Sequence, residues 1–362
     1  MKPNEPPLIS VVIPNYNGAA YLAACLSSLV RQTRSDFEVL VVDNGSSDDS
    51  FETARRAAPG AVILRQERNL GFAGGANAGI HAGAAEWIAI LNNDTEVSEE
   101  WLARCADAIG RHPDAAFLAC RILDFGRREL GYSAGDCFLR AGIGYRRGQE
   151  QPDRPEYDVE SETFAACGCA ALYRKSVLER VGGYDERLFA YMEDVELGLR
   201  LQALGLRGYY LPGARVYHHG AATSGGEFSP LGVNLRTRNS LLVLLKSVPA
   251  RILLRCAPMI LFSQVFWLAR VIRHGRIFSY LRGLVGVLRL TPAMLRSRNE
   301  LRRQWDSGTV ERLWRAILRS EATARADCDC SASDCPSLFL RLYFRLFRSV
   351  GVESSSLTRD SR

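Results

Sequence analysis

Roughly the first 120 residues alternate between short apolar runs and helix-like segments, and this alternation limits the possible folds more than any other feature. Apolar runs typical of strands lie at 9–13, 38–42, 61–64, 87–91 and 116–119. Helical patterns separate them, at about 19–32, 48–57, 75–84 and 98–111. Strands that alternate with helices form βαβ units, in which the strands lie parallel. We therefore expect an α/β fold with a mostly parallel sheet flanked by helices.

Polar or turn-forming residues follow three of these runs. They are Pro14, Asn15 and Asn17 after the first run, Asp43 after the second, and Asn92, Asn93 and Asp94 after the fourth. Because the carboxyl ends of parallel strands meet at one edge of a sheet, where open α/β folds bind ligands, we expect a polar cleft there. Carboxylate and amide oxygens suit a hard divalent cation. Ordinary loop or helix-cap chemistry is the alternative for each residue.

A glycine-rich segment, from Asn69 to Gly79, follows the third run. Its glycines would let the backbone approach a ligand closely, and the helix that it opens would present N–H groups to an anion. The segment lacks G-x-G-x-x-G, so it carries no dinucleotide fingerprint. A tight turn before a helix is an equally good interpretation.

A second ordered block is expected from 164 to about 220, after loops and an irregular hairpin at 125–163. Glu193 and Asp194 open a predicted helix, where negatively charged side chains interact favourably with the helix dipole. The alternative is that one of them is a general base. His218 and His219 end a predicted strand. In one interpretation, one of these histidines completes the coordination of a cation held by Asp94. In the other, neither histidine binds a ligand.

Positive charge is concentrated in the C-terminal third. Residues 246–320 carry 15 Arg or Lys against 3 Asp or Glu, whereas the remainder carries 31 against 37. Two or three amphipathic helices are predicted at 240–305, and the uncharged apolar stretch at 256–269 is shorter than the roughly 20 residues that span a bilayer. We expect these helices to lie on an anionic membrane surface. The alternative is a helical subdomain or dimer interface, and no nucleic-acid motif is present.

Compartment and domain boundaries follow from the rest of the chain. The first residues lack the apolar core of a signal peptide, and ten scattered cysteines indicate reduced thiols in the cytosol. We expect domains at 1–245 and 246–320, and a tail at 321–362 that is poorly ordered in part. Cys328, Cys330 and Cys335 lie in that tail, where an unstructured segment is favoured over a zinc site.

Six segments in order resemble the family 2 glycosyltransferases, most closely the rhamnosyltransferase-type branch that builds bacterial cell-surface polysaccharide. They are SVVIPNYNG (10–18), VVDNGSSDDS (41–50), NLGFAGGANAG (69–79), LNNDTEV (91–97), GGYDERLFAYMEDVELGLRL (182–201) and VYHHGAATS (216–224). The resemblance runs from about residue 9 to 239. It implies a GT-A fold, a nucleotide-diphosphate sugar donor and Mg²⁺ or Mn²⁺.

The resemblance also implies roles for individual residues. Asp194 matches the catalytic base, and Asp94 and His218 match the metal ligands, with His219 the alternative. The family's metal motif is usually Asp-x-Asp, but Asn92 replaces its first acid here. The donor-binding residues implied are Pro14, Asn15, Asn17, Asp43, Asn69, Gly71, Asn77, Asn92 and Asn93. Those implied for the acceptor or a diphosphate are Gly183, Asp185, Glu193, Arg236, Arg238 and Asn239.

The implied reaction is inverting transfer to a glycan or polyprenyl-diphosphate-linked acceptor at the inner face of the cell membrane. dTDP-rhamnose is the favoured donor. The alternative donors are UDP-galactose, UDP-glucose and UDP-GlcNAc. A further alternative is that the chain is an inactive homologue that only binds a sugar nucleotide. An oligomer is compatible with the sequence, and no nucleic-acid partner is expected.

Overall fold

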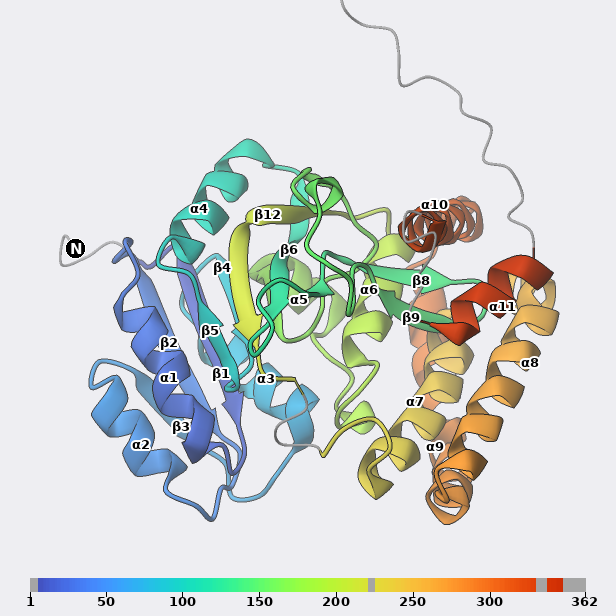
Figure 1. Cartoon of the computed structure of the whole chain (residues 1–362), viewed down its shortest axis with the longest axis horizontal. Helices are drawn as coiled ribbons and strands as arrows, with labels where there is room; N and C mark the ends of the chain where they lie inside the picture. Colours follow the sequence, from blue (N-terminus) through green and yellow to red (C-terminus); the bar gives the residue numbers. More distant parts are fainter. Residues whose placement is uncertain (1–5, 221–224, 330–336, 348–362) are drawn as a thin grey trace, which may run out of the picture.

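The computed structural model describes residues 6–220, 225–329 and 337–347. A ten-stranded mixed sheet forms the centre of this part, in the order β10-β12-β6-β11-β4-β1-β2-β3, with β5 paired to β12 and β7 to β6 (Figure 1). The predicted α/β sheet flanked by helices is confirmed.

The amino-terminal half of the sheet is parallel, as the alternation of strands and helices predicted. Its strands are β1 (Ile9–Asn15), β2 (Phe37–Asp43), β3 (Val62–Arg65) and β4 (Trp87–Leu91). The helices are α1 (Ala19–Val30), α2 (Ser50–Ala57), α3 (Gly71–Ala82) and α4 (Trp101–Arg111). Val11 packs with α1, α2 and α4 on one face, and Val12 packs with α3 on the other. Both faces are covered, so β1 and β4 are buried throughout.

The other half of the sheet mixes strand directions. β11 (Ala170–Arg174) lies antiparallel between β4 and β6 (Ala115–Asp124), and β12 (Arg207–His218) lies parallel to β6. The short strands β5 (Thr95–Val97) and β7 (Gly131–Ser133) pair outside the central path, and β10 (Ser161–Glu162) forms one edge of the sheet beside β12. Helices α5 (Lys175–Val181) and α6 (Glu193–Ala203) belong to the second predicted block.

The stretch predicted as loops and an irregular hairpin, 125–163, contains a two-stranded sheet of β8 (Asp136–Leu139) and β9 (Ile143–Arg146). This hairpin reaches from the main sheet toward the C-terminal helices (Figure 1). It is well ordered because successive side chains are buried on opposite sides: Phe138 packs in a cluster with α6, and Leu139 packs in a cluster with the C-terminal helices. The hairpin therefore belongs to the core.

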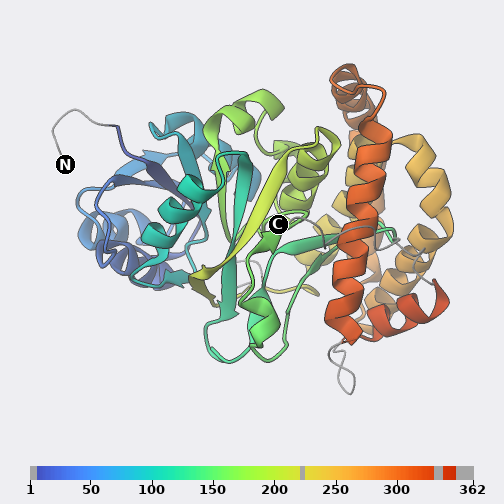
Figure 2. The ribbon, with the colours of Figure 1, turned by 90° about the horizontal axis from the view of Figure 1, so that it is seen from above.

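The C-terminal helices gather at one end of the sheet (Figure 2). They are α7 (Pro230–Ser247), α8 (Ala250–Arg273), α9 (Ile277–Arg303), α10 (Thr309–Asp329) and α11 (Leu338–Leu346). α10 runs through the boundary expected at residue 321, because its buried acids bind the hairpin. Glu321 pairs with Arg140 at 2.6 Å, and Asp327 accepts from the Tyr145 hydroxyl at 2.5 Å. Cys330 and Cys335 lie outside the described residues, so the zinc alternative is untested.

Candidate active site

Asp94 and His218 lie together at the carboxyl-terminal edge of the sheet. β5 pairs with β12 so that Thr95 lies opposite His218, which places the imidazole beside the end of β4. His218 Nε2 is 3.1 Å from Asp94 Oδ1, and both side chains are buried. His219 instead stacks on the Phe125 ring, with 3.7 Å between ring centroids. His218, and not His219, is therefore the histidine that lies beside Asp94.

The donor atoms at this position fit a divalent cation. A carboxylate oxygen and an imidazole nitrogen meet there, and the side-chain amide nitrogen of Asn92 is 3.4 Å from His218 Nε2. His218 Nδ1 is buried and has no hydrogen-bond partner among the described residues. An imidazole with an orphaned ring nitrogen beside a carboxylate is a combination that Mn²⁺ and similar ions accept.

The donor-side residues form a second polar group along the ends of β1 and β2. Asp43 is buried, accepts a hydrogen bond from the Ser46 amide and lies 3.7 Å from Arg65 Nε. Asn93 donates to the side-chain oxygen of Asn15 at 2.7 Å, which joins the β4 and β1 ends. Pro14 is buried beside them, whereas Asn17 is exposed. The sheet thus brings these sequence-distant residues to one edge.

The glycine-rich segment is held by side chains around it. Asn44 Oδ1 accepts from the Leu70 amide and Asn69 Oδ1 accepts from the Gly71 amide, so α3 starts at Gly71 rather than at residue 75 as predicted. Gly71 has φ +76°, and a Cβ there would lie 2.4 Å from the Phe189 carbonyl oxygen. Only glycine fits that backbone position.

Asn77, expected to bind the donor, contacts protein backbone. Its amide donates to the Tyr184 carbonyl at 2.9 Å and its oxygen accepts from the Tyr184 N–H at 2.9 Å. Gly183 has φ +61° and leaves room for this side chain. Asn77 and Gly183 therefore join α3 to the segment that leads to α6.

Asp194 lies in the first turn of α6 with both carboxylate oxygens fixed. Oδ2 accepts from the Gly168 amide at 3.0 Å, and Oδ1 accepts from the Val195 amide at 2.7 Å. The side chain is half-buried. The Cys169 carbonyl accepts from the Asn92 amide at 2.9 Å, so the turn at 167–169 lies between the Asp94 side of the site and Asp194.

Glu193, beside Asp194, is buried with Oε2 unpartnered among the described residues. Burial, with the charge of Asp194, raises the pKa of Glu193 to about 8. Arg236 lies with its guanidinium over the Tyr191 ring, 4.6 Å from its centroid. A protonated Glu193 can donate a hydrogen bond where an ionised one cannot.

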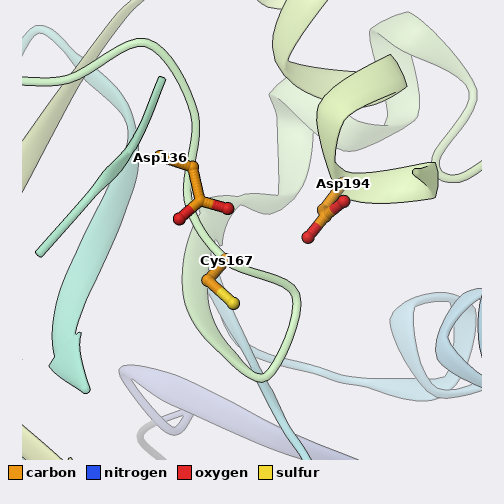
Figure 3. Close-up of side chains that lie close together, drawn as sticks. All are labelled: Asp136, Cys167 and Asp194. Atoms are coloured by element: carbon orange, nitrogen blue, oxygen red, sulfur yellow. The ribbon is translucent and has the colours of Figure 1, made fainter. Parts of the chain in front are cut away.

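Sequence reasoning missed Asp136, which faces Asp194. In Figure 3 the side chains of Asp136, Cys167 and Asp194 lie close together. Their candidate ligand atoms are all within 4.8 Å of one another. Burial, with the charge of Asp194, raises the pKa of Asp136 to about 7. Two carboxyls this close do not readily ionise together. No local motif marks Asp136, which follows a glycine in a stretch predicted as loop.

The remaining acceptor-side residues make contacts within the protein. Asp185 binds Arg187 and Lys246, which together hold the pKa of that carboxyl well below its usual range against the effect of burial. Asn239 donates to the backbone carbonyls of residues 188, 190 and 191, and Arg238 to those of 187 and 188. The Asn239 amide and the Nε and Nη2 of Arg238 are therefore occupied by the protein itself.

A hollow of about 670 Å³ opens at the opposite, amino-terminal edge of the strands, beside Leu8, Glu86 and Lys175. None of the residues singled out above borders it. The convergence of polar side chains, and not this hollow, identifies the site.

Comparison with known proteins identifies the family to which the chain is similar. A family model described as "Glycosyl transferase family 2" matches residues 10–182. The N-acetylglucosaminyl-diphospho-decaprenol L-rhamnosyltransferase of Mycobacterium tuberculosis (strain ATCC 25618 / H37Rv) is 30% identical over 241 residues, covering 61% of this chain and 78% of the relative. A PGL/p-HBAD biosynthesis glycosyltransferase of Mycobacterium bovis (strain BCG / Pasteur 1173P2) is 30% identical over 200 residues, covering 54% and 69%.

Two solved structures share the fold. GalNAc-T7 with UDP, GalNAc and Mn²⁺ superposes with a TM-score of 0.55 at 18% identity, covering 67% of this chain and 48% of that longer chain. S. aureus TarS 1-349 superposes with a TM-score of 0.51 at 16% identity, covering 88% and 91%. At such identities the likeness shows the fold, which is GT-A.

Proposed function

The chain belongs to glycosyl transferase family 2, and we propose that it transfers a sugar, with rhamnose favoured, from a nucleotide diphosphate to a hydroxyl of a lipid-linked or glycan acceptor. One observation carries the proposal: the Asp194 carboxylate is fixed by the Gly168 and Val195 amides at a sheet edge that also holds Asp94 and His218. The name of the M. tuberculosis relative supports rhamnose as the sugar and a polyprenyl-diphosphate sugar as the acceptor.

Asp194 acts as the base in this proposal. It accepts a proton from the acceptor hydroxyl, and the oxygen attacks the anomeric carbon from the face opposite the leaving nucleoside diphosphate. One displacement inverts the anomeric configuration without a covalent sugar–enzyme intermediate. Two backbone N–H groups hold the Asp194 carboxylate in a fixed position, from which it would meet the acceptor hydroxyl.

Asp94 and His218 would hold Mg²⁺ or Mn²⁺. When bound, the cation supplies positive charge to the leaving diphosphate. Asn92 offers only a neutral oxygen in place of the family's usual first acid, so the protein donates one carboxylate. The Mn²⁺ in the GalNAc-T7 structure supports the choice of metal.

The donor nucleotide would lie against the ends of β1 and β2. Asp43 is placed to accept hydrogen bonds from a base or ribose, with Asn15 and Asn93 beside it. Arg236 is the basic side chain that we assign to a diphosphate, because its guanidinium Nε has no hydrogen-bond partner among the described residues.

Other donors define the second candidate function. UDP-galactose, UDP-glucose and UDP-GlcNAc fit the same nucleotide-diphosphate site, and Asn92 is the one feature that favours an inactive homologue. A panel of dTDP-rhamnose and these three donors, assayed with N-acetylglucosaminyl-diphospho-decaprenol with and without Mn²⁺, tests all of them. We expect Mn²⁺-dependent transfer from dTDP-rhamnose. Transfer from a UDP-sugar but not from dTDP-rhamnose would overturn the proposed donor. Absence of turnover with every donor would overturn the proposed transferase activity.

We also propose that the C-terminal helices lie on the inner face of the cell membrane. Exposed apolar side chains on α8, α9 and α11 support it: Leu254, Leu261, Phe278, Leu288, Leu342 and Leu346. Arg255, Arg273, Arg282, Arg289, Arg341 and Arg345 are exposed on the same helices. Apolar side chains among arginines suit the interface of an anionic bilayer.

α8 is the one helix among the described residues that is long and apolar enough to cross a membrane, with a mean hydropathy of 1.7 over its most apolar window. Its contacts favour an interfacial position instead. Ser263 donates to the Ala141 carbonyl at 2.7 Å and Trp267 donates to Thr237 at 2.9 Å, so both side chains attach the helix to the protein body. Flotation of the full chain with anionic and neutral vesicles tests whether these helices bind a membrane surface. Absence of binding to anionic vesicles at low salt would overturn the proposed membrane contact.

A further inference from the structure

Three residues with side chains adopt left-handed backbone conformations just before α6. Phe189, Tyr191 and Met192 have φ values of 66°, 68° and 71°. Such conformations are unfavourable for residues other than glycine and persist only where the surroundings enforce them. Glu193 and Asp194 follow directly, so this segment sets where α6 begins and where the Asp194 carboxylate lies.

The Asn239 side chain, from α7, contacts this segment. Its amide nitrogen lies 2.9, 2.8 and 2.7 Å from the carbonyl oxygens of Leu188, Ala190 and Tyr191. An amide group has two hydrogens, which these three acceptors share. Asn239 is fully buried, so water cannot replace the contacts.

Arg238 orients the amide and extends the contact. Its Nε donates to Asn239 Oδ1 at 2.8 Å, which fixes the amide nitrogen toward the carbonyls. Its Nη2 donates to the Leu188 carbonyl at 2.8 Å and to the Arg187 carbonyl at 3.1 Å. The pair thus binds four of the five carbonyls from 187 to 191.

The other side of the segment is also held. The Phe189 carbonyl accepts from the Ala73 amide in the first turn of α3 at 3.1 Å. The left-handed backbone therefore lies between α3, on the donor side of the site, and α7. Without the Asn239 amide, three carbonyls would lose a buried donor, and the segment would relax toward ordinary conformations.

We infer that Asn239 is a positioning residue, whose amide holds residues 188–191 in the conformation that keeps the Asp194 carboxylate beside Gly168. Asn239 acts through the backbone and does not touch substrate. The inference rests on the proposed role of Asp194 as the base.

Asn239→Ala in the full chain tests it, with dTDP-rhamnose and N-acetylglucosaminyl-diphospho-decaprenol as substrates. We expect kcat to fall at least ten-fold, while KM for the donor and the Kd for dTDP with Mn²⁺ change less than three-fold. Ser240→Ala, at the next position of α7, is the matched control and should stay within two-fold of the wild type. Among the described residues, the Ser240 hydroxyl donates only within its own helix, to the Thr237 carbonyl.

A second substitution separates positioning from loss of stability. Glycine adopts positive φ without strain, so Met192→Gly in the Asn239→Ala background should restore at least three-fold of the lost kcat. The free energy of unfolding of each variant, measured in urea, shows whether kcat recovers beyond what the recovery of stability explains. If Asn239→Ala does not fold, Asn239→Ser, which retains one donor, replaces it in the same comparison.

The outcomes separate this inference from the proposed function. An active Asp194→Asn enzyme overturns the base assignment and the inference together. If Asp194→Asn is inactive but folded Asn239→Ala keeps wild-type kcat, only the positioning role fails. A fall in kcat matched by an equal loss of dTDP binding, or no rescue by Met192→Gly, also overturns it.

Discussion

His218 Nε2 lies 3.1 Å from Asp94 Oδ1, although 124 residues separate them in the chain. The contact arises from the antiparallel pairing of β5 and β12, in which His218 is registered opposite Thr95, the residue after Asp94. β12 also shifts register against β6 between Leu211 and Arg215 before it reaches His218. The metal half of the proposed site therefore depends on the geometry of one irregular strand.

His218→Ala should weaken the response to metal. The substitution removes one of the two proposed ligands, so we expect the Mn²⁺ concentration for half-maximal transfer to rise at least about ten-fold. His219→Ala is the matched control and should raise it far less, because His219 stacks on Phe125. Equal effects of the two substitutions would contradict the assignment of His218.

Asn92→Asp should have the opposite effect. The Asn92 side chain lies 3.4 Å from His218 Nε2, so the substitution adds a carboxylate at the proposed metal position. We expect the half-maximal Mn²⁺ concentration to fall roughly ten-fold, because a second acid attracts a hard cation. Asn299→Asp, at an exposed position of α9 away from the site, controls for the added charge. An unchanged Mn²⁺ response would show that Asn92 is not near the ion.

Asp194→Asn should abolish transfer without loss of donor binding. The amide cannot accept the acceptor proton, and a general base contributes roughly 10²–10⁴-fold to a rate. The substitution also keeps an oxygen for the Gly168 N–H. Steady-state transfer assays measure the rate, and calorimetric titration with dTDP and Mn²⁺ measures binding. Turnover near that of the wild type would rule out Asp194 as the base.

Asp136→Asn should flatten the dependence of stability on pH. The pKa of Asp136 is raised to about 7, so the folded state keeps a proton that the unfolded chain, with an ordinary carboxyl pKa near 3.9, has released. Stability from this group is present below about pH 4 and is lost as the pH rises toward 7. The asparagine does not titrate and keeps an oxygen for Ser133, which donates to Asp136 Oδ1 at 2.7 Å.

Urea unfolding at about pH 5 and pH 8 measures this difference. Between these two pH values, the free energy of unfolding should decline less in Asp136→Asn than in the wild type. The difference between the two declines should be on the order of 1–3 kcal/mol. Glu193, whose pKa is also raised, titrates in both proteins and leaves the comparison intact. Glu67→Gln, at an exposed acid, should behave as the wild type. Parallel pH profiles for all three would refute the raised pKa.

Replacing Phe278 and Leu288 by serine should weaken membrane binding. Their side chains are 83% and 75% exposed, so the change removes apolar surface without disturbing a core. Burying such a side chain in a membrane interface is worth about 1.5–3 kcal/mol, which predicts a loss of roughly ten-fold or more in partitioning to anionic vesicles. Val62→Ser, on the edge strand β3, is the control. Unchanged flotation of the double variant would exclude this surface.

Local sequence patterns predicted the parallel half of the sheet well, because buried strands between helices leave strong local signals. The run at 87–91 coincides with β4 residue for residue. The start of α3 was misplaced by four residues, because Asn44 and Asn69 bond the Leu70 and Gly71 amides from outside the helix. Such side-chain contacts depend on tertiary folding and leave no periodic pattern.

The site was only partly accessible to sequence reasoning. The order of motifs brought Asp94, Asp194 and His218 into one hypothesis. Asp136 was missed, because its relation to Asp194 exists only once β8 folds beside α6. Asn239 was assigned to a diphosphate by resemblance, whereas its contacts are with backbone carbonyls that α7 meets after the chain has folded.

The buried acids of α10 decide how this enzyme can be divided. Arg140, in the loop after β8, has Glu321 as its counter-ion, and both side chains are almost fully enclosed. A chain shortened before α10 would lose this ion pair and would expose apolar side chains such as Leu139, which pack with Ala324 of α10. The C-terminal helices are therefore not a detachable unit, and a minimal folded fragment of this protein has to extend through Asp327.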